Sequence, residues 1–223
     1  MKVGCLVSGG KDSLYATYLA SKKHEVKCLI SLKPNKESWM FHVPNVELVE
    51  VQAKLIGLPL ISVKTEGVKE EELKDLKAAV NVAIKKYKIE GLVTGALESN
   101  YQKERVDNLC KELKLDHIAP LWHKKIMEYM HELLLSKFKI IIVGVAADGL
   151  NEKWLGRVID ARCLDDLDRL NREKGIHIGG EGGEYETFVL SCPLFKKELI
   201  VKEAEKIMEN ENTGYLKIKK LNL

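Results

Sequence analysis

The chain has 223 residues, of which 45% are hydrophobic and 31% are charged, as in a soluble globular protein with room for one large domain or two small ones. The formal net charge of only +3 argues against a surface dedicated to nucleic acid. The longest apolar run, residues 140–147, is too short to span a bilayer, and the first residues lack a signal-peptide pattern. We therefore expect a cytoplasmic protein without membrane or nucleic-acid partners.

In the first 120 residues, short apolar runs alternate with segments of helical periodicity. Strands are expected at residues 2–7, 25–32, 60–63 and 89–95, and helices at 14–23, 45–56, 69–87 and 101–115. This alternation predicts an α/β fold with a doubly wound, mostly parallel sheet. Such sheets bind ligands beyond the carboxyl ends of their strands, where the strand order reverses. The loops at 8–13 and 95–101 are therefore expected at one edge of the sheet.

The pattern changes beyond Pro120. Helices are expected at residues 122–138 and 162–174, and strands at 139–145, 187–190, 198–201 and 215–221. A glycine-dense loop separates the second of these helices from the strands that follow it. We expect two domains, residues 1–120 and a smaller C-terminal α+β domain at 121–223.

Cysteine and histidine spacing gives no indication of a structural metal. The five cysteines are widely spaced and form no C-x-x-C pair, which is typical of buried, reduced thiols in a cytosolic protein. The six histidines form no H-E-x-x-H motif and do not cluster at zinc-ligand spacing.

The first expected strand runs into the sequence Ser-Gly-Gly-Lys-Asp-Ser at residues 8–13. Gly9 and Gly10 let backbone N–H groups approach a ligand closely, and the following helix N-terminus favours an anion such as phosphate. Lys11 can bind a phosphate oxygen, and a Mg²⁺ ion would explain a carboxylate at Asp12. The other polar residues of the loop, which can donate hydroxyl hydrogen bonds, are Ser8 and Ser13.

Neither familiar phosphate-binding motif fits this loop. A Walker A sequence would need Gly at Cys5 and Ser or Thr at Asp12, and G-x-G-x-x-G is absent. A glycine turn that only caps a helix would explain the shape of the loop. It would not explain why a lysine, an aspartate and two serines fall within six positions.

Two further stretches carry candidate site residues. Gln102 and Arg105 lie three apart at the start of an expected helix, so they share a face from which a guanidinium can reach a phosphate or carboxylate; a solvated helix face is the simpler alternative. Residues 179–187, GGEGGEYET, combine four glycines with three carboxylates and one tyrosine. A plain acidic turn would not need so much glycine, which is costly to order.

These motifs carry a family resemblance. SGGKDS resembles the PP-loop (S-G-G-x-D-S) of the N-type ATP pyrophosphatases, which cleave ATP between the α and β phosphates. The stretches G-A-L-x-S-x-Y-Q-x-x-R at 95–105 and G-E-G-G-E-Y-E-T at 180–187, in this order, resemble the diphthine–ammonia ligase family, which makes diphthamide on elongation factor 2. The resemblance covers the whole chain and implies a Rossmann-like, PP-loop (HUP-like) first domain.

The resemblance implies ATP-dependent amidation of the diphthine carboxylate on elongation factor 2, with ammonium, through an acyl-adenylate. ATP and Mg²⁺ are the expected cofactors, and a homodimer is compatible with it. The implied ATP-binding residues are Ser8, Gly9, Gly10, Lys11, Asp12, Ser13, Gly95, Ser99, Gln102 and Arg105, with Asp12 also a Mg²⁺ ligand. The implied substrate-binding residues are Glu181, Gly182, Gly183, Glu184, Tyr185, Glu186 and Thr187. The implied catalytic residues are Lys11, Asp12, Glu184 and Glu186.

The residue chemistry agrees with this reaction. A trimethylammonium group suits an aromatic face with carboxylates nearby, and an acidic pocket can gather ammonium and accept its proton. Ammonia is expected to arrive free, because Cys5 lies inside an expected core strand and cannot serve as a glutaminase nucleophile. Two alternatives stay open: a PP-loop tRNA-modifying enzyme, which would call for a more basic surface, and a regulatory module that binds ATP or AMP without chemistry.

Overall fold

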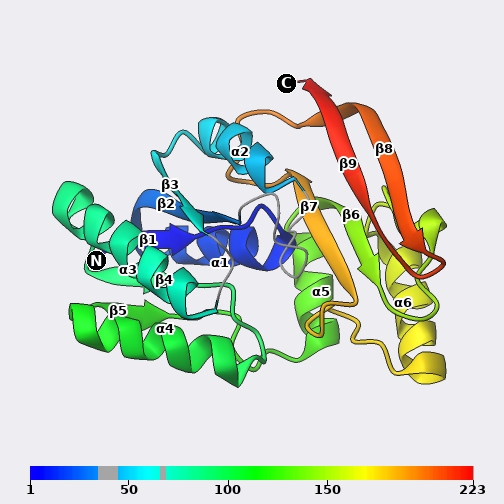
Figure 1. Cartoon of the computed structure of the whole chain (residues 1–223), viewed down its shortest axis with the longest axis horizontal. Coiled ribbons are helices and arrows are strands. Elements are labelled where there is room, and N and C mark those ends of the chain that lie inside the picture. Colours follow the sequence, from blue (N-terminus) through cyan, green and yellow to red (C-terminus); the bar gives the residue numbers. More distant parts are fainter. Residues whose placement is uncertain (35–44, 66–68, 223) are drawn as a thin grey trace. The chain divides into compact units, whose positions relative to one another are not determined.

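The computed structural model describes residues 1–34, 45–65 and 69–222 (Figure 1). The chain divides into two compact units, Met1–His123 and Lys124–Leu223, each of which has its own sheet. Among the described residues, no helix combines the length and the apolar character that crossing a membrane requires.

The first unit contains a five-stranded sheet with the order β3-β2-β1-β4-β5, in which all pairs are parallel. Its strands are β1 (Lys2–Leu6), β2 (Glu25–Pro34), β3 (Leu60–Thr65), β4 (Gly91–Val93) and β5 (Asp116–Ile118). Its helices are α1 (Lys11–Ser21), α2 (Val49–Ile56), α3 (Lys69–Tyr87) and α4 (Asn100–Leu113), with a short 3₁₀ turn η1 (Val46–Leu48) before α2. The doubly wound parallel sheet expected from the sequence is confirmed.

Apolar runs form the central strands because both faces of the sheet are covered. Val3 and Cys5 of β1 are fully buried, as is Leu92 of β4. Helices α3 and α4 pack on one face, where Val80 and Leu109 join a hydrophobic cluster with residues of β2 and β4 (Figure 1). The strand order reverses between β1 and β4, so the loops that follow these two strands meet at the switch point where such sheets bind ligands.

The second unit contains a four-stranded sheet with the order β7-β6-β9-β8, whose neighbours are antiparallel. Its elements are α5 (Ile126–Leu135), β6 (Lys139–Ala146), the 3₁₀ turn η2 (Glu152–Trp154), α6 (Ala161–Lys174), β7 (Tyr185–Ser191), β8 (Ile200–Asn210) and β9 (Thr213–Asn222). The Asp160 side chain caps α6 by accepting the Cys163 N–H at 2.8 Å, and Gly175 ends the helix with φ of +73°.

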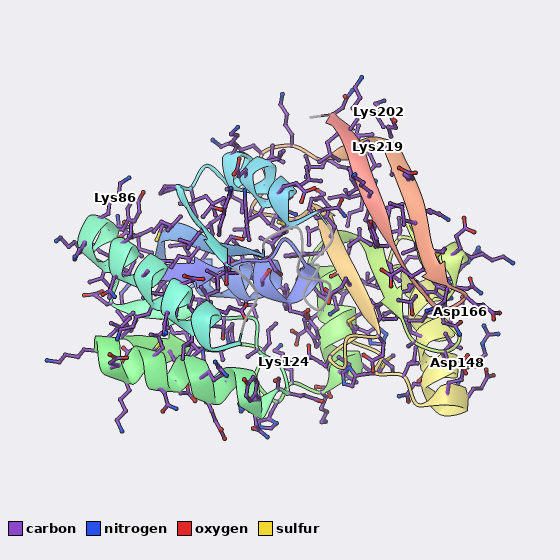
Figure 2. The ribbon with its side chains drawn as sticks, viewed as in Figure 1. Lys86, Lys124, Asp148, Asp166, Lys202 and Lys219 are labelled. Carbon is purple, nitrogen blue, oxygen red and sulfur yellow. The ribbon has the colours of Figure 1, made fainter. Side chains whose placement is uncertain are left out.

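The strands β8 and β9 form a long ribbon that the sequence predicted only in part, as 198–201 and 215–221. Most residues of β8 are exposed. Lys202 belongs to β8 and Lys219 to β9 (Figure 2). Lys219 pairs with Glu205 across the ribbon at 2.9 Å. Charged residues on an outer strand interrupt the alternation of apolar and polar residues from which a strand is predicted.

Candidate active site

The loop at residues 8–13 follows β1 and forms the start of α1. Gly9 has φ of +88°, a left-handed conformation that favours glycine, and Gly10 is the N-cap residue of α1. The Ser13 hydroxyl accepts the Ser8 N–H at 3.2 Å and donates to the Gly10 carbonyl at 3.2 Å. In this structure the two loop serines therefore hold the turn together.

Lys11 and Asp12 bring opposite charges to the N-terminus of α1. Lys11 is only 2% exposed, and its Nζ donates to both Asp12 carboxylate oxygens, at 2.9 and 2.8 Å. The Asp12 side chain remains 29% exposed. A buried ammonium is costly unless it is paired, so the loop holds a cation ready beside a carboxylate that solvent can reach.

A glutamine of α2 supports this loop, and this glutamine was not among the residues predicted from the sequence. Gln52 is 1% exposed, and its Nε2 donates to the Gly9 carbonyl at 3.2 Å. A buried glutamine in the apolar stripe of a helix is the signal that could have identified it.

The loop after β4 lies against the loop after β1. A Cβ placed on Gly95 would lie 2.7 Å from the Asp12 carbonyl carbon and 2.7 Å from the Ser13 nitrogen. Only a residue without a side chain lets the two backbones approach this closely. The two loops that the sequence expected at one edge of the sheet are thus in direct contact.

The remaining residues of the second motif lie at the start of α4. The Arg105 guanidinium donates to the Tyr101 hydroxyl and lies over the Tyr101 ring, 4.9 Å from its centroid. The Ser99 carbonyl accepts the Lys103 N–H at 3.0 Å. Gln102 belongs to α4, but its side chain lies outside the described part of the structure.

The acidic glycine loop at residues 177–184 precedes β7 in the second unit. The Glu184 carboxylate accepts two backbone N–H groups, from His177 at 2.9 Å and from Gly182 at 2.8 Å. Tyr185 is 3% exposed, and its hydroxyl donates to the Ile178 carbonyl at 2.5 Å. Glu184 and Tyr185, which the sequence placed against the substrate, therefore shape the loop.

The other candidate residues of this loop differ in exposure. Glu186 is exposed on β7 and Glu181 is half-buried in the loop, whereas Thr187 is 8% exposed and pairs with Ile142 of β6. Gly183 has φ of +83°, and Gly182 is exposed next to it. Of the three glutamates of this stretch, Glu186 is thus the exposed one, whereas Glu181 and Glu184 are half-buried.

Two models of one family cover this chain. The diphthamide synthase N-terminal domain matches residues 1–117, and the diphthamide synthase C-terminal domain matches residues 123–223. The chain belongs to the diphthamide synthase family.

Curated relatives in this family are named diphthine–ammonia ligase. The mouse protein is 34% identical over all of this chain and 92% of its own length, and the human protein is 33% identical with the same coverage. The protein from Schizosaccharomyces pombe is 34% identical over 98% of this chain but only 39% of its own length. A solved structure from Methanocaldococcus jannaschii, described as a predicted subunit of tRNA methyltransferase, is 19% identical, and the match covers 89% of this chain and 100% of that chain with a TM-score of 0.43.

The cysteines of this family member do not form a reactive site. All five are free and buried. Burial raises the pKa of the Cys5 thiol to about 12 and that of Cys192 to about 11. These thiols remain protonated at neutral pH, so they are poor nucleophiles and poor metal ligands.

Proposed function

We propose that the protein is a diphthine–ammonia ligase, which converts the carboxylate of diphthine on elongation factor 2 into a primary amide with ATP and ammonium. The observation that carries this proposal is that both domain models of the family match this chain and together cover nearly all of it. A relative that matches over the whole chain is named diphthine–ammonia ligase. The geometry of the two loops at the sheet switch point supports it.

In this proposal the first unit binds ATP. The glycine backbone and the N-terminus of α1 hold the β and γ phosphates, and Lys11 turns from Asp12 to a phosphate oxygen. The other proposed contacts are those of Ser8, Ser13, Gly95, Ser99, Gln102 and Arg105. Their position at or after the ends of β1 and β4 supports this assignment.

The donor set fits a Mg²⁺ ion that is held partly by the nucleotide. No group of three or more His, Cys, Asp or Glu side chains suited to a metal occurs within residues 1–34, 45–65 and 69–222. Mg²⁺ commonly binds through one or two carboxylates together with substrate phosphates, and Asp12 supplies such a carboxylate. Bound there, Mg²⁺ would offset charge that develops on the pyrophosphate leaving group.

The reaction has two steps. The diphthine carboxylate attacks the α phosphorus of ATP, which gives an acyl-adenylate and releases pyrophosphate. Ammonia then attacks the acyl carbon, loses a proton and displaces AMP. Lys11 stabilises the leaving pyrophosphate, and the acidic loop of the second unit binds the trimethylammonium group and gathers ammonium.

Within the acidic loop, we assign the roles of the carboxylates from their contacts. Glu181 and Glu186 reach solvent and are the proposed partners of the cationic substrate, with Glu186 also a candidate base for the ammonium proton. Glu184, Tyr185 and the glycines 182 and 183 support them by shaping the loop, and Thr187 anchors the loop end within the sheet.

Ammonia is proposed to enter free. Cys5, the cysteine nearest the amino end of the chain, is fully buried and its pKa is raised to about 12. A buried, protonated thiol does not act as the nucleophile of a glutaminase. Cytoplasmic location, the absence of a nucleic-acid partner and a homodimer stay predictions.

The decisive experiment incubates the purified protein with Mg-ATP, ammonium and elongation factor 2 carrying diphthine, and omits each component in turn. We expect AMP and pyrophosphate only with the modified factor, together with the mass change of a hydroxyl replaced by an amino group. AMP without the factor would indicate another acceptor, such as tRNA. ADP, or binding without cleavage, would overturn the proposed chemistry.

The Lys11→Met variant tests the role of the first loop in the same assay. Loss of a cation that stabilises the leaving group is expected to lower the rate of AMP formation by about 10²-fold or more. Lys23→Met, at an exposed lysine just beyond α1, is the matched control and should retain the wild-type rate. A Lys11→Met variant that is folded and fully active would remove Lys11 from the mechanism.

A further inference from the structure

The glycine loop of the second unit directs its backbone N–H groups inward. Five successive amides, those of residues 179–183, donate to groups of the same loop. Gly180 and Gly183 donate to the carbonyls of His177 and Gly180, at 2.9 and 3.2 Å. Gly182 donates to the Glu184 carboxylate at 2.8 Å. The loop is therefore closed by its own donors.

The two other amides converge on one side chain. The Nδ1 atom of His177 accepts the N–H of Gly179 at 3.1 Å and the N–H of Glu181 at 3.3 Å. Backbone nitrogens can only donate, so Nδ1 must carry a lone pair. The ring is consequently the neutral tautomer with its proton on Nε2.

This arrangement decides what kind of ligand the loop can bind. Loops that bind phosphate turn successive N–H groups outward towards the anion, as a helix N-terminus does. Here those groups donate to His177, Gly180 and Glu184. The nearby acidic side chains are those of Glu181, which is half-buried in the loop, and Glu186, which is exposed on the strand that follows. Such a loop disfavours an anion and suits a cation.

We propose that His177 is a positioning residue, which holds the acidic loop in the form that binds the cationic group of the substrate. The assignment of that substrate rests on the proposed function. His177 acts through the Gly179 and Glu181 amides: while they donate to Nδ1, they fix the backbone that carries the Glu181 carboxylate. Without this acceptor the two amides turn outward, and the loop loses both its shape and its preference for a cation.

Two substitutions of similar polarity both remove the ring but place the hydrogen-bond acceptor at different positions. In His177→Asn the side-chain oxygen occupies the place of Nδ1, whereas in His177→Gln it occupies the place of Nε2. We expect His177→Asn to keep KM for the modified factor within about twofold, and His177→Gln to raise it about tenfold or more, the equivalent of one lost hydrogen bond. KM for ATP should be unchanged in both.

Several results would overturn this role. One is a folded His177→Asn variant that loses affinity as strongly as His177→Gln. Another is a His177→Gln variant with the wild-type KM. A rise in KM for ATP as large as that for the factor would indicate general damage instead of loop positioning. If His177→Gln fails to fold, His177→Ala, which also removes the acceptor, takes its place in the comparison with His177→Asn.

A readout that needs no turnover separates this inference from the proposed function. Amide hydrogen exchange of Gly179 and Glu181 should be slow in the wild type and in His177→Asn, and fast in His177→Gln. This pattern would support the positioning role even if the wild-type protein produced no AMP. Equal exchange in all three proteins would refute it even if the enzyme assay succeeded.

Discussion

At the scale of single residues, the site depends on how closely two backbones approach. Gly95 leaves no room for a side chain, because a Cβ there would lie 2.7 Å from backbone atoms of Asp12 and Ser13. Backbone atoms cannot move aside as the end of a flexible side chain can. Any larger residue at position 95 must therefore displace the loop that we propose to bind ATP.

We predict that Gly95→Ala weakens ATP binding, by about 1–3 kcal/mol as expected for overpacking of a closely packed site. Titration calorimetry with Mg-ATP measures this effect. Gly156→Ala, in the second unit, is the control: its φ of +84° makes alanine strained, but the nearest atom to the new Cβ lies 3.7 Å away. It should lower stability and leave ATP affinity intact. Equal ATP affinities for wild type and Gly95→Ala would contradict the prediction.

At the scale of elements, three hydrogen-bonded side chains link α4 to β5 and to Thr94, the residue that follows β4. The Asp107 carboxylate of α4 contacts His117 Nδ1 of β5 at 2.5 Å, and His117 Nε2 contacts the Thr94 hydroxyl at 2.8 Å. Hydrogen bonds from Lys103 and His117 hold the pKa of Asp107 below its usual range. The imidazole of His117 therefore has a hydrogen-bond partner at each of its two nitrogens.

We predict that Thr94→Val lowers the free energy of unfolding by about 1–3 kcal/mol, because it leaves a buried imidazole nitrogen without its hydrogen-bond partner. Thr94→Ser keeps the hydroxyl and should cost clearly less. Urea unfolding of the three proteins at neutral pH gives the comparison. If Thr94→Val is no less stable than Thr94→Ser, the hydrogen bond to His117 does not contribute the predicted stability.

At the scale of the whole molecule, buried thiols occur in both units. Burial raises the pKa of Cys5 and Cys110 to about 12, and that of Cys28 and Cys163 to about 11. An unfolded thiol ionises near its ordinary pKa of about 8.5. The thiols therefore lose their protons more readily in the unfolded chain than in the folded one. Their contribution to the free energy of unfolding is complete below the unfolded pKa of about 8.5 and is lost as pH rises towards 11–12.

We predict that Cys5→Ala is less stable than the wild type at pH 7, by about 1–2 kcal/mol for the small cavity. Above pH 9 this difference should shrink by about 1.4 kcal/mol per pH unit, because only the wild type ionises Cys5 on unfolding. Urea unfolding between pH 7 and 10.5 measures it. A difference that does not vary with pH would mean that burial does not perturb this thiol.

Ammonium-dependent turnover should survive in Cys5→Ala, and its loss in a folded variant would contradict entry of free ammonia.

The central sheet could be predicted because its strands are apolar runs that end at glycines, as β1 does before Gly9. Strand β5 was missed, since Asp116–Ile118 is only three residues long and begins with a charge. The helix expected to start at residue 122 begins at Ile126. The helix expected from residue 45 begins at Val49, after a 3₁₀ turn.

The candidate site shows the same division. Contact between the loops at 8–13 and 95 followed from topology, because the carboxyl ends of adjacent parallel strands share an edge. The topology did not predict that Glu184 and Tyr185 form hydrogen bonds within their own loop, or that His177 accepts backbone N–H groups there. These hydrogen bonds depend on the direction of individual N–H groups, which is set by left-handed glycines such as Gly180, with φ of +71°.

The self-closed glycine loop also affects the entropy of recognition. Fixing the backbone of one residue costs about 1–2 kcal/mol of conformational entropy, and glycine loses the most. Because residues 179–183 already donate to their own loop, this cost falls on folding of the chain. A ligand that arrives at a pre-ordered loop has no such ordering to bring about, so more of its contact energy appears as affinity.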